Sequence, residues 1–460
     1  MNVVLLVVDS LRACSLGRAA RGGPRTPWLD RLAEECVLFR RAHATECWTL
    51  PTHLSMFTGL LPSEHGGHFQ RMDYRGTAPT LAELLAGAGH HTEVITRNSI
   101  FDGSLPGVTR GFSVNTPVLA DIGRARGLGL LVALTKPRIR RLVRDSGFFH
   151  AMQRQNRAFL TTLARMIVPA DRQALDTALG RMETLRRANR PYFLFLNLYD
   201  VHAPYAPTPT SPLRPFRTLD GWIENLLLPG AAVRLGAHAY LRDGFRFSPR
   251  VRRMLRRRYH EAIELMDAKL AAFHDAARAG GLLDDTMLIV VSDHGEAFGD
   301  HDLYFHDASV YQTHLHVPLL VQHPGVAPRV VDDVVSTRDL CALVRSVALE
   351  ATTRGTVLDP QVPAASPVAL AEHFFYPHAP RAAARYAQNL AAAVVGTRKL
   401  LVRREGTFHY DLERDPDEQR PEPLPVVEFA ARCRRDGVSA GAVEGALAHL
   451  RRWEATTAAA

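Results

Sequence analysis

The chain has 460 residues, of which 46% are hydrophobic and 22% are charged, and its formal net charge is +9. This is the composition of an ordinary soluble globular protein, and the length allows two or three domains. A positive surface steers anionic substrates, but the small excess is spread over the whole chain and gives only weak support for such a substrate.

Cysteine spacing and apolar runs exclude further classes of protein. The five cysteines are scattered and form no CxxC pair, which argues against a disulfide framework and against a thiolate zinc site. No signal-peptide pattern precedes the first predicted strand, and no apolar run reaches about 18 residues. We therefore expect a protein of the reducing cytoplasm without a transmembrane helix.

The chain begins with a predicted strand that ends in a carboxylate. Residues 2–8 form an apolar run that is typical of a buried strand in a parallel sheet, and Asp9 follows directly. Ligands of open α/β sheets bind at the carboxyl ends of the strands. Asp9 is therefore a candidate metal ligand, and the alternative is that it only caps the following turn.

The segment from Trp48 to Gly59 predicts a short helix that starts near Thr49. The apolar side of this helix includes Leu54 and Phe57. A helix N-terminus attracts anions because its free N–H groups point outward, and a hydroxyl beside a metal there can ionise and attack. Thr49 is a candidate nucleophile on this interpretation, and a plain N-cap on the alternative one.

Two predicted strands in the middle of the chain also lead to polar residues. Residues 92–96 end at Arg97 and Asn98, and residues 192–198 are followed by His202. An imidazole at such a strand end can donate to a non-bridging oxygen or protonate a leaving group, since its pKa suits either role. A lone histidine is usually structural, but the repeated pattern of polar strand ends favours a function for His202.

Basic segments at about 115–188 and 206–258 interrupt this pattern. The first is helix-like and could form an insertion or lid, and its stretch 127–144 could rest on a membrane surface. The arginine-rich run at 252–258 lacks interleaved aromatic residues, so we interpret it as a solvated helix start. No nucleic-acid partner is expected.

The strand predicted at 286–292 carries the most informative motif. Asp293 and His294 stand where this strand exits, and Gly295 allows the sharp turn that follows. Aspartate and histidine are both metal ligands, and a divalent cation needs more than one anionic ligand. We therefore expect Asp293, His294 and the distant Asp9 to converge on one ion.

These motifs together resemble the sulfatase branch of the alkaline phosphatase superfamily. The resemblance spans most of the chain and rests on segments in the order of that family, namely Val7-Val8-Asp9-Ser10-Leu11-Arg12, Thr26-Pro27-Trp28-Leu29-Asp30, Trp48-Thr49-Leu50-Pro51-Thr52-His53, Thr58-Gly59-Leu60, Pro62-Ser63-Glu64-His65-Gly66, His202-Ala203-Pro204-Tyr205, Ser292-Asp293-His294-Gly295-Glu296, Tyr410-Asp411-Leu412 and Asp415-Pro416-Asp417-Glu418. It implies a divalent metal, a catalytic role for His306 and substrate contacts by His53 and Asn98.

The resemblance also implies the fold and the division of the chain. We predict an α/β fold with a mixed, mostly parallel central sheet flanked by helices, which is alkaline phosphatase-like, and a small C-terminal antiparallel subdomain. Strand-like runs at 391–396, 399–402 and 408–412 belong to that subdomain. The predicted units are a catalytic domain at 1–365, a small α+β subdomain at 366–425, and a C-terminal helix and tail at 426–460.

The sequence departs from the family pattern at the nucleophile and among the ligands. Sulfatases carry a Cys or Ser that is converted to formylglycine, but Thr49 stands at this position and His53 replaces the following Arg. Threonine cannot become formylglycine, and relatives with an unmodified Thr or Ser act on phosphorus. Ser10 replaces a second Asp and His294 replaces Asn or Gln, which favours zinc or manganese over calcium.

The predicted function is hydrolysis or phosphotransfer of a small anionic phospho- or sulfo-ester. In this hypothesis Thr49 attacks beside the ion, and histidines hold the transferred group and protonate the leaving alcohol. The site comprises Asp9, Thr49, Asp293 and His294 at the metal, His202 and His306 in catalysis, and His53 and Asn98 at the substrate. The alternatives are a sulfate-ester hydrolase without formylglycine, a transferase that needs a second alcohol, and a non-catalytic binding relative.

Overall fold

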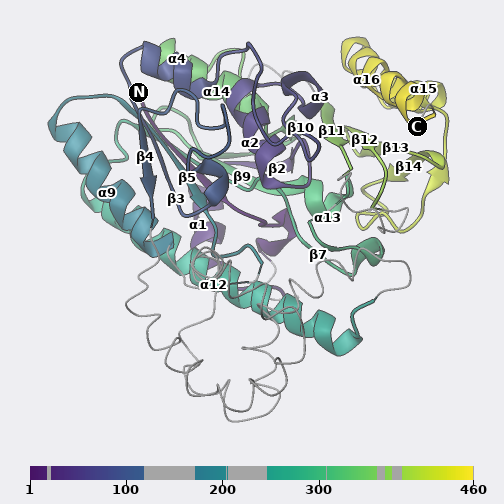
Figure 1. Ribbon diagram of the computed structural model, residues 1–460, viewed down its shortest axis with the longest axis horizontal. Coiled ribbons are helices and arrows are strands. Elements are labelled where there is room, and N and C mark those ends of the chain that lie inside the picture. Colours follow the sequence, from purple (N-terminus) through teal and green to yellow (C-terminus); the bar gives the residue numbers. More distant parts are fainter. Residues whose placement is uncertain are drawn as a thin grey trace, which may run out of the picture.

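Figure 1 shows the computed structural model of the protein, which describes residues 1–17, 22–118, 171–203, 205, 246–306, 308–359, 368–375 and 386–458. In this part of the chain an eight-stranded sheet has the order β10-β2-β9-β6-β1-β5-β3-β4. The strands are β1 (Asn2–Val8), β2 (Val37–His43), β3 (His91–Thr96), β4 (Val114–Pro117), β5 (Tyr192–Leu198), β6 (Thr286–Val291), β9 (His316–Gln322) and β10 (Arg329–Ser336).

The sheet is parallel except for β9, which runs antiparallel to both β2 and β6. In the centre, β1 pairs in parallel with β5 and with β6, so that Val8 lies opposite Leu198 and Val7 opposite Val291. This register brings the residues that follow the three strands to the same edge of the sheet. The predicted mixed, mostly parallel sheet is confirmed.

Helices cover both faces of the sheet, which explains why its central strands are apolar on both sides. Because side chains alternate along a strand, Val4 and Leu6 face one helical layer and Val3 and Leu5 face the other. The first layer contains α1 (Pro27–Glu35), α9 (Asp171–Arg187) and α12 (Pro249–Ala279). The second contains α2 (Thr49–Thr58), α4 (Leu81–Gly87) and α14 (Asp339–Leu349).

Short elements complete the edge at which the central strands end. They are η1 (Ala13–Ser15), α3 (Pro62–His65), η3 (Ser99–Phe101), β7 (Ala297–Phe298), η6 (Asp300–Asp302), β8 (Tyr304–Phe305) and α13 (Gln312–Leu315). β7 and β8 form a small antiparallel ribbon of their own. His306 therefore follows directly after strand β8 of this ribbon.

A separate antiparallel sheet forms the predicted C-terminal subdomain, coloured green-yellow in Figure 1. Its strands are β11 (Val368–His373), β12 (Leu390–Val395), β13 (Arg398–Arg403), β14 (Gly406–Asp411) and β15 (Glu422–Pro423). The prediction of one helix and a tail at 426–460 is wrong, because two helices pack on this sheet, α15 (Val426–Arg435) and α16 (Ala440–Ala458). Gly437, at φ 81°, makes the turn between them, and Phe429, Leu450 and Trp453 join the subdomain core.

The predicted insertions fall largely outside the described residues. Residues 119–170, which include the membrane-contact stretch at 127–144, and residues 206–245 belong to this group. At the ends of the predicted insertions, β4 and α9 belong to the main sheet and its helical layer, and residues 249–258 form the start of α12. No helix among the described residues is long and apolar enough to span a bilayer. The lid, the membrane contact and the boundary near residue 365 stay predictions.

Candidate metal and nucleophile site

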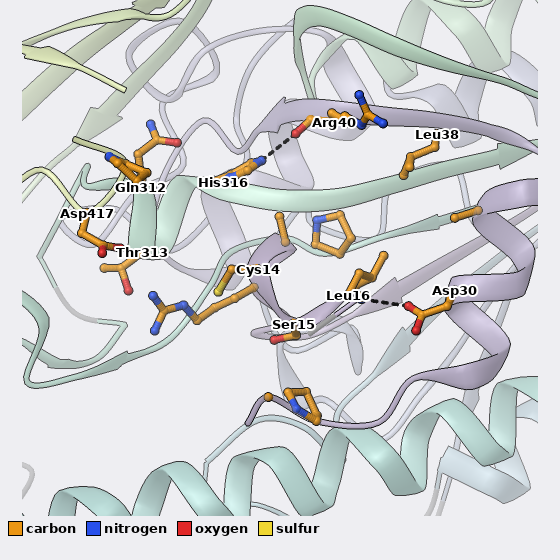
Figure 2. A pocket seen from close by; sticks show the side chains of 18 of the residues that line it. Cys14, Ser15, Leu16, Asp30, Leu38, Arg40, Gln312, Thr313, His316 and Asp417 are labelled. Atoms are coloured by element: carbon orange, nitrogen blue, oxygen red, sulfur yellow. Dashed lines mark hydrogen bonds between the residues drawn. The ribbon is translucent and has the colours of Figure 1, made fainter. Parts of the chain in front are cut away.

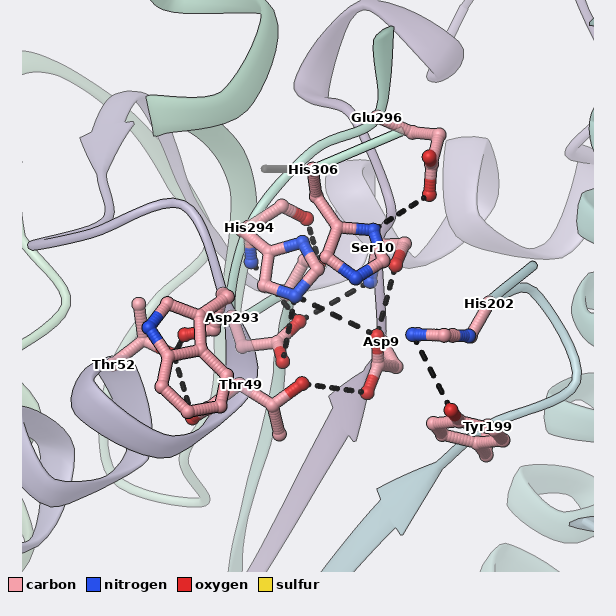
Figure 3. A network of polar contacts seen from close by, with 12 residues as sticks. Asp9, Ser10, Thr49, Thr52, Tyr199, His202, Asp293, His294, Glu296 and His306 are labelled. Carbon is pink, nitrogen blue, oxygen red and sulfur yellow. Dashed lines mark hydrogen bonds and ion pairs between the residues drawn. The ribbon is translucent and has the colours of Figure 1, made fainter. Parts of the chain in front are cut away.

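Three predicted ligands meet at the carboxyl ends of the adjacent strands β1 and β6 (Figure 3). Asp9, Asp293 and His294 each offer one ligand atom, and these atoms lie within 4.8 Å of one another. His294 Nε2 lies 3.4 Å from Asp293 Oδ2 and 3.7 Å from Asp9 Oδ1. All three side chains are fully buried. Parallel pairing therefore joins a residue near the start of the chain to two residues far along it.

The hydrogen bonds of this cluster leave ligand atoms available for a cation. His294 Nδ1 lies 2.9 Å from the Gly295 carbonyl oxygen, so this nitrogen carries the proton and the Nε2 lone pair faces the carboxylates. Asp293 Oδ2 and His294 Nε2 have no hydrogen-bond partner among the described residues. Burial and the charge of Asp9 raise the pKa of Asp293 well above its ordinary value, and burial lowers the pKa of His294. A divalent cation fits this set, because it would offset both carboxylates and satisfy both unpartnered atoms.

Ser10 holds the two carboxylates in place. Its hydroxyl donates to Asp9 Oδ1 over 2.8 Å, and its backbone N–H donates to Asp293 Oδ1 over 3.2 Å. Ser10 adopts φ 65°, a left-handed conformation that costs a non-glycine residue about 1 to 3 kcal/mol. Tyr259 stabilises this turn by donating its hydroxyl to the Ser10 carbonyl oxygen. The residue that replaces a second aspartate therefore orients ligands through hydrogen bonds and adds no negative charge.

Thr49 is the first residue of α2 and points at the ligand cluster (Figure 3). Its hydroxyl lies 3.4 Å from Asp9 Oδ2, and the side chain is 4% exposed. The N-cap of α2 is Trp48, and no side chain caps this end of the helix, so Thr49 is not the N-cap. Thr52 fixes the first turn by donating its hydroxyl toward the Trp48 and Thr49 carbonyl oxygens. The structure therefore brings the predicted nucleophile to the predicted ligands.

Two histidines lie beside the ligands in different electrostatic states. The His306 ring stacks on His294 with centroids 4.5 Å apart, and its Nδ1 lies 3.2 Å from Oε2 of the buried Glu296. Burial lowers the pKa of His306, but the charge and hydrogen bond of Glu296 together with the charges of Asp9 and Glu46 outweigh burial, and the pKa is raised. Burial lowers the pKa of His202 to about 4. At neutral pH His306 is therefore the better proton donor, and His202 is neutral.

His202 has a defined orientation next to His306. The two rings meet edge to face with centroids 4.7 Å apart, and His202 also stacks on Tyr199. His202 Nδ1 lies 2.5 Å from the Ala203 carbonyl oxygen, and the Tyr199 hydroxyl lies 3.3 Å from Nε2. In the neutral ring, Nδ1–H donates to the Ala203 carbonyl oxygen and Nε2 accepts from the Tyr199 hydroxyl. Of the two predicted catalytic histidines, His306 thus stacks directly on the candidate ligand His294, and His202 contacts His306.

The two predicted substrate contacts are enclosed by protein groups, and His53 Nδ1 lies 3.8 Å from Asp293 Oδ2. His53 is fully buried among Phe57, Phe101 and Phe195, and its Nδ1–H donates to the Thr49 carbonyl oxygen over 2.7 Å. Burial lowers the pKa of His53 to about 4. This placement suits a residue that positions Thr49, and the predicted substrate contact of His53 stays a prediction.

Asn98 is also held by neighbouring groups rather than turned toward open space. Its Nδ2 donates to Asn197 Oδ1 over 3.0 Å, and its Oδ1 accepts from the Ile100 N–H. Asn197 in turn donates to Asp9 Oδ2 over 3.4 Å. Asn98 therefore supports the ligand Asp9 through one intermediate side chain, and its predicted substrate contact stays a prediction.

Sequence reasoning did not assign roles to Asn197, Tyr199 and Glu296. Each lies within or just beyond one of the strand-end segments already singled out, so a search of the two or three residues around each strand end would have found them. Glu296 was the hardest to assign, because a fully buried carboxylate becomes meaningful only when its partner His306 is known.

A separate cleft of about 1500 Å³ lies between the start of η1, α1 and the strands β2 and β9 (Figure 2). Its walls include Cys14, Asp30, Arg40 and His316, and the His316 Nε2 atom is 2.8 Å from the Arg40 carbonyl oxygen. None of the predicted site residues lines this cleft. Its wall mixes acidic and basic side chains, and neither of the two ligand clusters found among the described residues lies in it.

Comparison with known proteins agrees with this geometry. The family model described as Sulfatase matches residues 1–348. Choline-sulfatase of Rhizobium meliloti (strain 1021) is 25% identical over 71% of this chain and 63% of its own length. Human iduronate 2-sulfatase is 23% identical over 71% of this chain and 60% of its own length. The matched part thus spans about three fifths of these relatives.

Solved structures share the fold over nearly the whole chain. The phosphonate monoester hydrolase of Agrobacterium radiobacter superposes with a TM-score of 0.63 at 21% identity, covering 98% of this chain and 96% of that one. The phosphonate monoester hydrolase from Silicibacter pomeroyi gives 0.63 at 18% identity, covering 95% and 93%. The matched domain, the sheet topology and the ligand cluster lead to one conclusion, that this chain belongs to the sulfatase family.

Proposed function

We propose that the protein is a metal-dependent hydrolase that cleaves a small anionic ester through Thr49, with phosphonate and phosphate esters as the favoured substrates. The observation that carries this proposal is the position of the Thr49 hydroxyl, 3.4 Å from Asp9 Oδ2 at the N-terminus of α2. Family membership and the fold shared with phosphonate monoester hydrolases support it.

Asp9, Asp293 and His294 would hold the cation together with the Thr49 oxygen. When bound, a divalent ion supplies positive charge that lowers the pKa of the Thr49 hydroxyl and offsets charge on the ester. The imidazole of His294 and the absence of a carboxylate at Ser10 favour zinc or manganese, with calcium as the alternative.

The residues around Thr49 carry out the proton transfers and the positioning that the reaction needs. The Thr49 hydroxyl gives its proton to solvent as its oxygen forms a bond to phosphorus, and the bond between phosphorus and the leaving oxygen breaks. His306, with its raised pKa, gives a proton to the departing alcohol and stays paired with Glu296. Water then attacks the phosphorus of phospho-Thr49, and the bond between phosphorus and the Thr49 oxygen breaks. One water hydrogen stays on the released phosphoryl group, the other proton returns to His306, and Thr49 takes back a proton from solvent. The neutral His202, held by Ala203 and Tyr199, positions the His306 ring, which it meets edge to face.

The nucleophile favours phosphorus over sulfur. Formylglycine releases sulfate by eliminating it from a hydrated aldehyde, and a threonine ester has no such route. Thr49 must instead be freed by a second displacement, which phosphate esters undergo in known Ser- and Thr-dependent relatives. Hydrolysis of sulfate esters is therefore the less favoured activity, and transfer to a second alcohol is the alternative outcome of the second displacement.

The decisive experiment compares wild type, Thr49→Ala and Thr58→Ala on aryl phosphonate, phosphodiester and sulfate esters in the presence of Zn²⁺ or Mn²⁺. Thr58 is a matched control at the far end of α2, where its hydroxyl donates to the Leu54 carbonyl oxygen. Thr49→Ala should lose about 10³-fold or more in kcat on the best ester, and Thr58→Ala should retain wild-type activity. Mass spectrometry of the quenched wild-type reaction should find phosphate on Thr49.

Equal rates for wild type and Thr49→Ala would remove Thr49 from the role. A clear preference for sulfate would change the substrate class from phosphorus esters to sulfate esters. Turnover that depends on an added alcohol would identify a transferase. The expected cytoplasmic location, the absence of a nucleic-acid partner and the peripheral membrane contact stay predictions.

A further inference from the structure

A second cluster of ligand-type side chains lies immediately before Thr49 in the chain. Glu46, Cys47 and His373 are at most 1% exposed, and each offers one ligand atom within 4.8 Å of the others. Cys47 Sγ lies 3.2 Å from Glu46 Oε1 and 3.7 Å from His373 Nδ1. His373 Nδ1 and Glu46 Oε1 are 2.6 Å apart. None of these three residues belongs to the site at Asp9.

The cluster joins the two parts of the fold. Glu46 and Cys47 belong to the loop between β2 and α2, whereas His373 is the last residue of β11 in the C-terminal subdomain. A backbone bond from the Glu372 N–H to the Thr45 carbonyl oxygen, 2.9 Å long, seats β11 against this loop. The sequence argued against a thiolate metal site because it contains no CxxC pair. The lack of a CxxC pair does not exclude a site whose ligands come from opposite halves of the chain.

The donor set and spacing suit a tetrahedral cation. A thiolate, an imidazole and a carboxylate are all zinc ligands, and their bond lengths to zinc imply ligand separations of roughly 3.3 to 3.6 Å. The two separations from Cys47 Sγ, 3.2 and 3.7 Å, are close to this range. The shorter His373–Glu46 contact is a hydrogen bond, and a cation would take the place of its proton. Ser309 already donates its backbone N–H to Cys47 Sγ over 3.4 Å, as outer partners of metal-bound thiolates do.

A buried oxygen gives independent support for a ligand here. Glu46 Oε2 has no hydrogen-bond partner among the described residues, although the side chain is 1% exposed. His373 Nε2 is likewise without a partner within the described part of the chain. A buried carboxylate is costly unless it is paired, and a divalent cation would satisfy the whole group.

We propose that Glu46, Cys47 and His373 bind a second, thiophilic divalent cation of the Zn²⁺ type, which fastens β11 of the C-terminal subdomain to the loop that leads into Thr49. This proposal does not rest on the proposed ester hydrolysis. Its role is positional, since the three ligands touch neither Thr49 nor the Asp9 cluster in any contact described above. A water molecule would occupy the fourth coordination position of the tetrahedral cation.

Cobalt(II) distinguishes the two sites by their ligands. A Co²⁺–thiolate bond gives an intense near-ultraviolet charge-transfer absorption, and the cluster of Asp9, Asp293 and His294 contains no sulfur to produce it. Metal-free wild-type protein titrated with Co²⁺ should therefore develop this absorption and bind two ions per chain by elemental analysis. Because this measurement uses the unaltered protein, it does not depend on any variant folding well.

Variants assign the absorption to its residues. Cys47→Ser and His373→Ala should abolish it and reduce binding to one ion, whereas Asp293→Asn should keep it while losing the other ion. Cys14→Ser is the matched control, because Cys14 is exposed and could bind cobalt adventitiously. Wild type without the absorption, or an absorption that survives in Cys47→Ser, would overturn the second site. Loss of ester hydrolysis alone would bear only on the proposed function.

Discussion

Two buried three-residue clusters lie near Thr49, the proposed nucleophile, and they differ in ligand type and in what they connect. The Asp9, Asp293 and His294 cluster is rich in oxygen, stands at the end of one sheet and faces Thr49 and two histidines. The cluster of Glu46, Cys47 and His373 contains sulfur and lies where the C-terminal subdomain meets the loop before α2. We propose a role in ester chemistry for the first cluster and a role in holding the loop before Thr49 for the second.

The difference teaches that burial and ligand count do not by themselves identify a catalytic centre. Both clusters are almost fully buried. What separates them is the neighbourhood, because the Thr49 hydroxyl lies 3.4 Å from Asp9 Oδ2 and the His306 ring stacks on His294. Three variants test this contrast, from the largest expected effect to the smallest.

Asp293→Asn should have the largest effect, because it removes one of two anionic ligands at the oxygen-rich cluster. We expect kcat/KM on the best ester to fall by roughly 10³-fold. The rise in Tm when metal is added to the stripped protein should also shrink. The measurements are steady-state rates and thermal melts at matched metal concentrations.

The control for this variant is Asp302→Asn, which removes a carboxylate from the same loop region outside the site, where it pairs with Arg246. Asp302→Asn should keep wild-type metal dependence. If Asp293→Asn also keeps it, the oxygen-rich cluster is not the catalytic metal site, and the contrast between the two clusters fails.

His306→Gln should have an intermediate effect that depends on the leaving group. Loss of a general acid costs about 10² to 10⁴-fold. The loss should be large for an alkyl phosphonate ester and small for a nitrophenyl ester, whose leaving group departs without a proton. His301→Asn serves as the control, since His301 stacks on Tyr311 and its positive φ of 52° suits asparagine. An equal loss on both esters would make His306 a positioning residue instead of an acid.

The smallest effect concerns α2, the helix that carries Thr49, and appears as a pH dependence of stability. His65 Nε2 lies 3.1 Å from the Pro51 carbonyl oxygen, its Nδ1 accepts from the Gly67 N–H, and burial lowers its pKa to about 3. An unfolded histidine titrates near pH 6.5, so between pH 6.5 and 3 only the unfolded state binds this proton. The stabilisation from neutral His65 is therefore complete above pH 6.5 and is lost as the pH falls.

Urea unfolding of metal-stripped wild type and His65→Gln at pH 6.5 and 5.0 isolates this contribution. Glutamine keeps a donor for the Pro51 carbonyl oxygen but does not titrate. The unfolding free energy of wild type should fall between these pH values by roughly 1 to 2 kcal/mol more than that of the variant. Parallel losses in the two proteins would show that His65 titrates normally.

The convergence of the candidate ligands was predictable from the sequence, and the reason is geometric. Parallel strands end at one edge of a sheet, so apolar runs that end in Asp9 and Asp293 place their carboxylates together without any knowledge of the loops. The resemblance then supplied Thr49 and His306. Neither argument could place His53, because its ring packs among aromatic residues from three separate segments.

Other features could not be predicted from the sequence, because they depend on contacts between residues that are far apart in the chain. β2 was missed because its sequence mixes Phe39 with exposed Arg40, and it is stabilised by pairing with β9 and β10. The amino-acid composition of β9 does not indicate that this strand runs antiparallel to its neighbours. The C-terminal helices were underestimated because the partner of their apolar faces is a sheet whose first strand was not predicted.

The central place of β1 between β5 and β6 has a consequence for how the chain is made. β1 precedes β5 and β6 in the chain, and it can pair with them only after residues 198 and 291 have been added. The growing polypeptide therefore carries an unpaired apolar strand until those residues are made, and such strands are prone to aggregation until they pair.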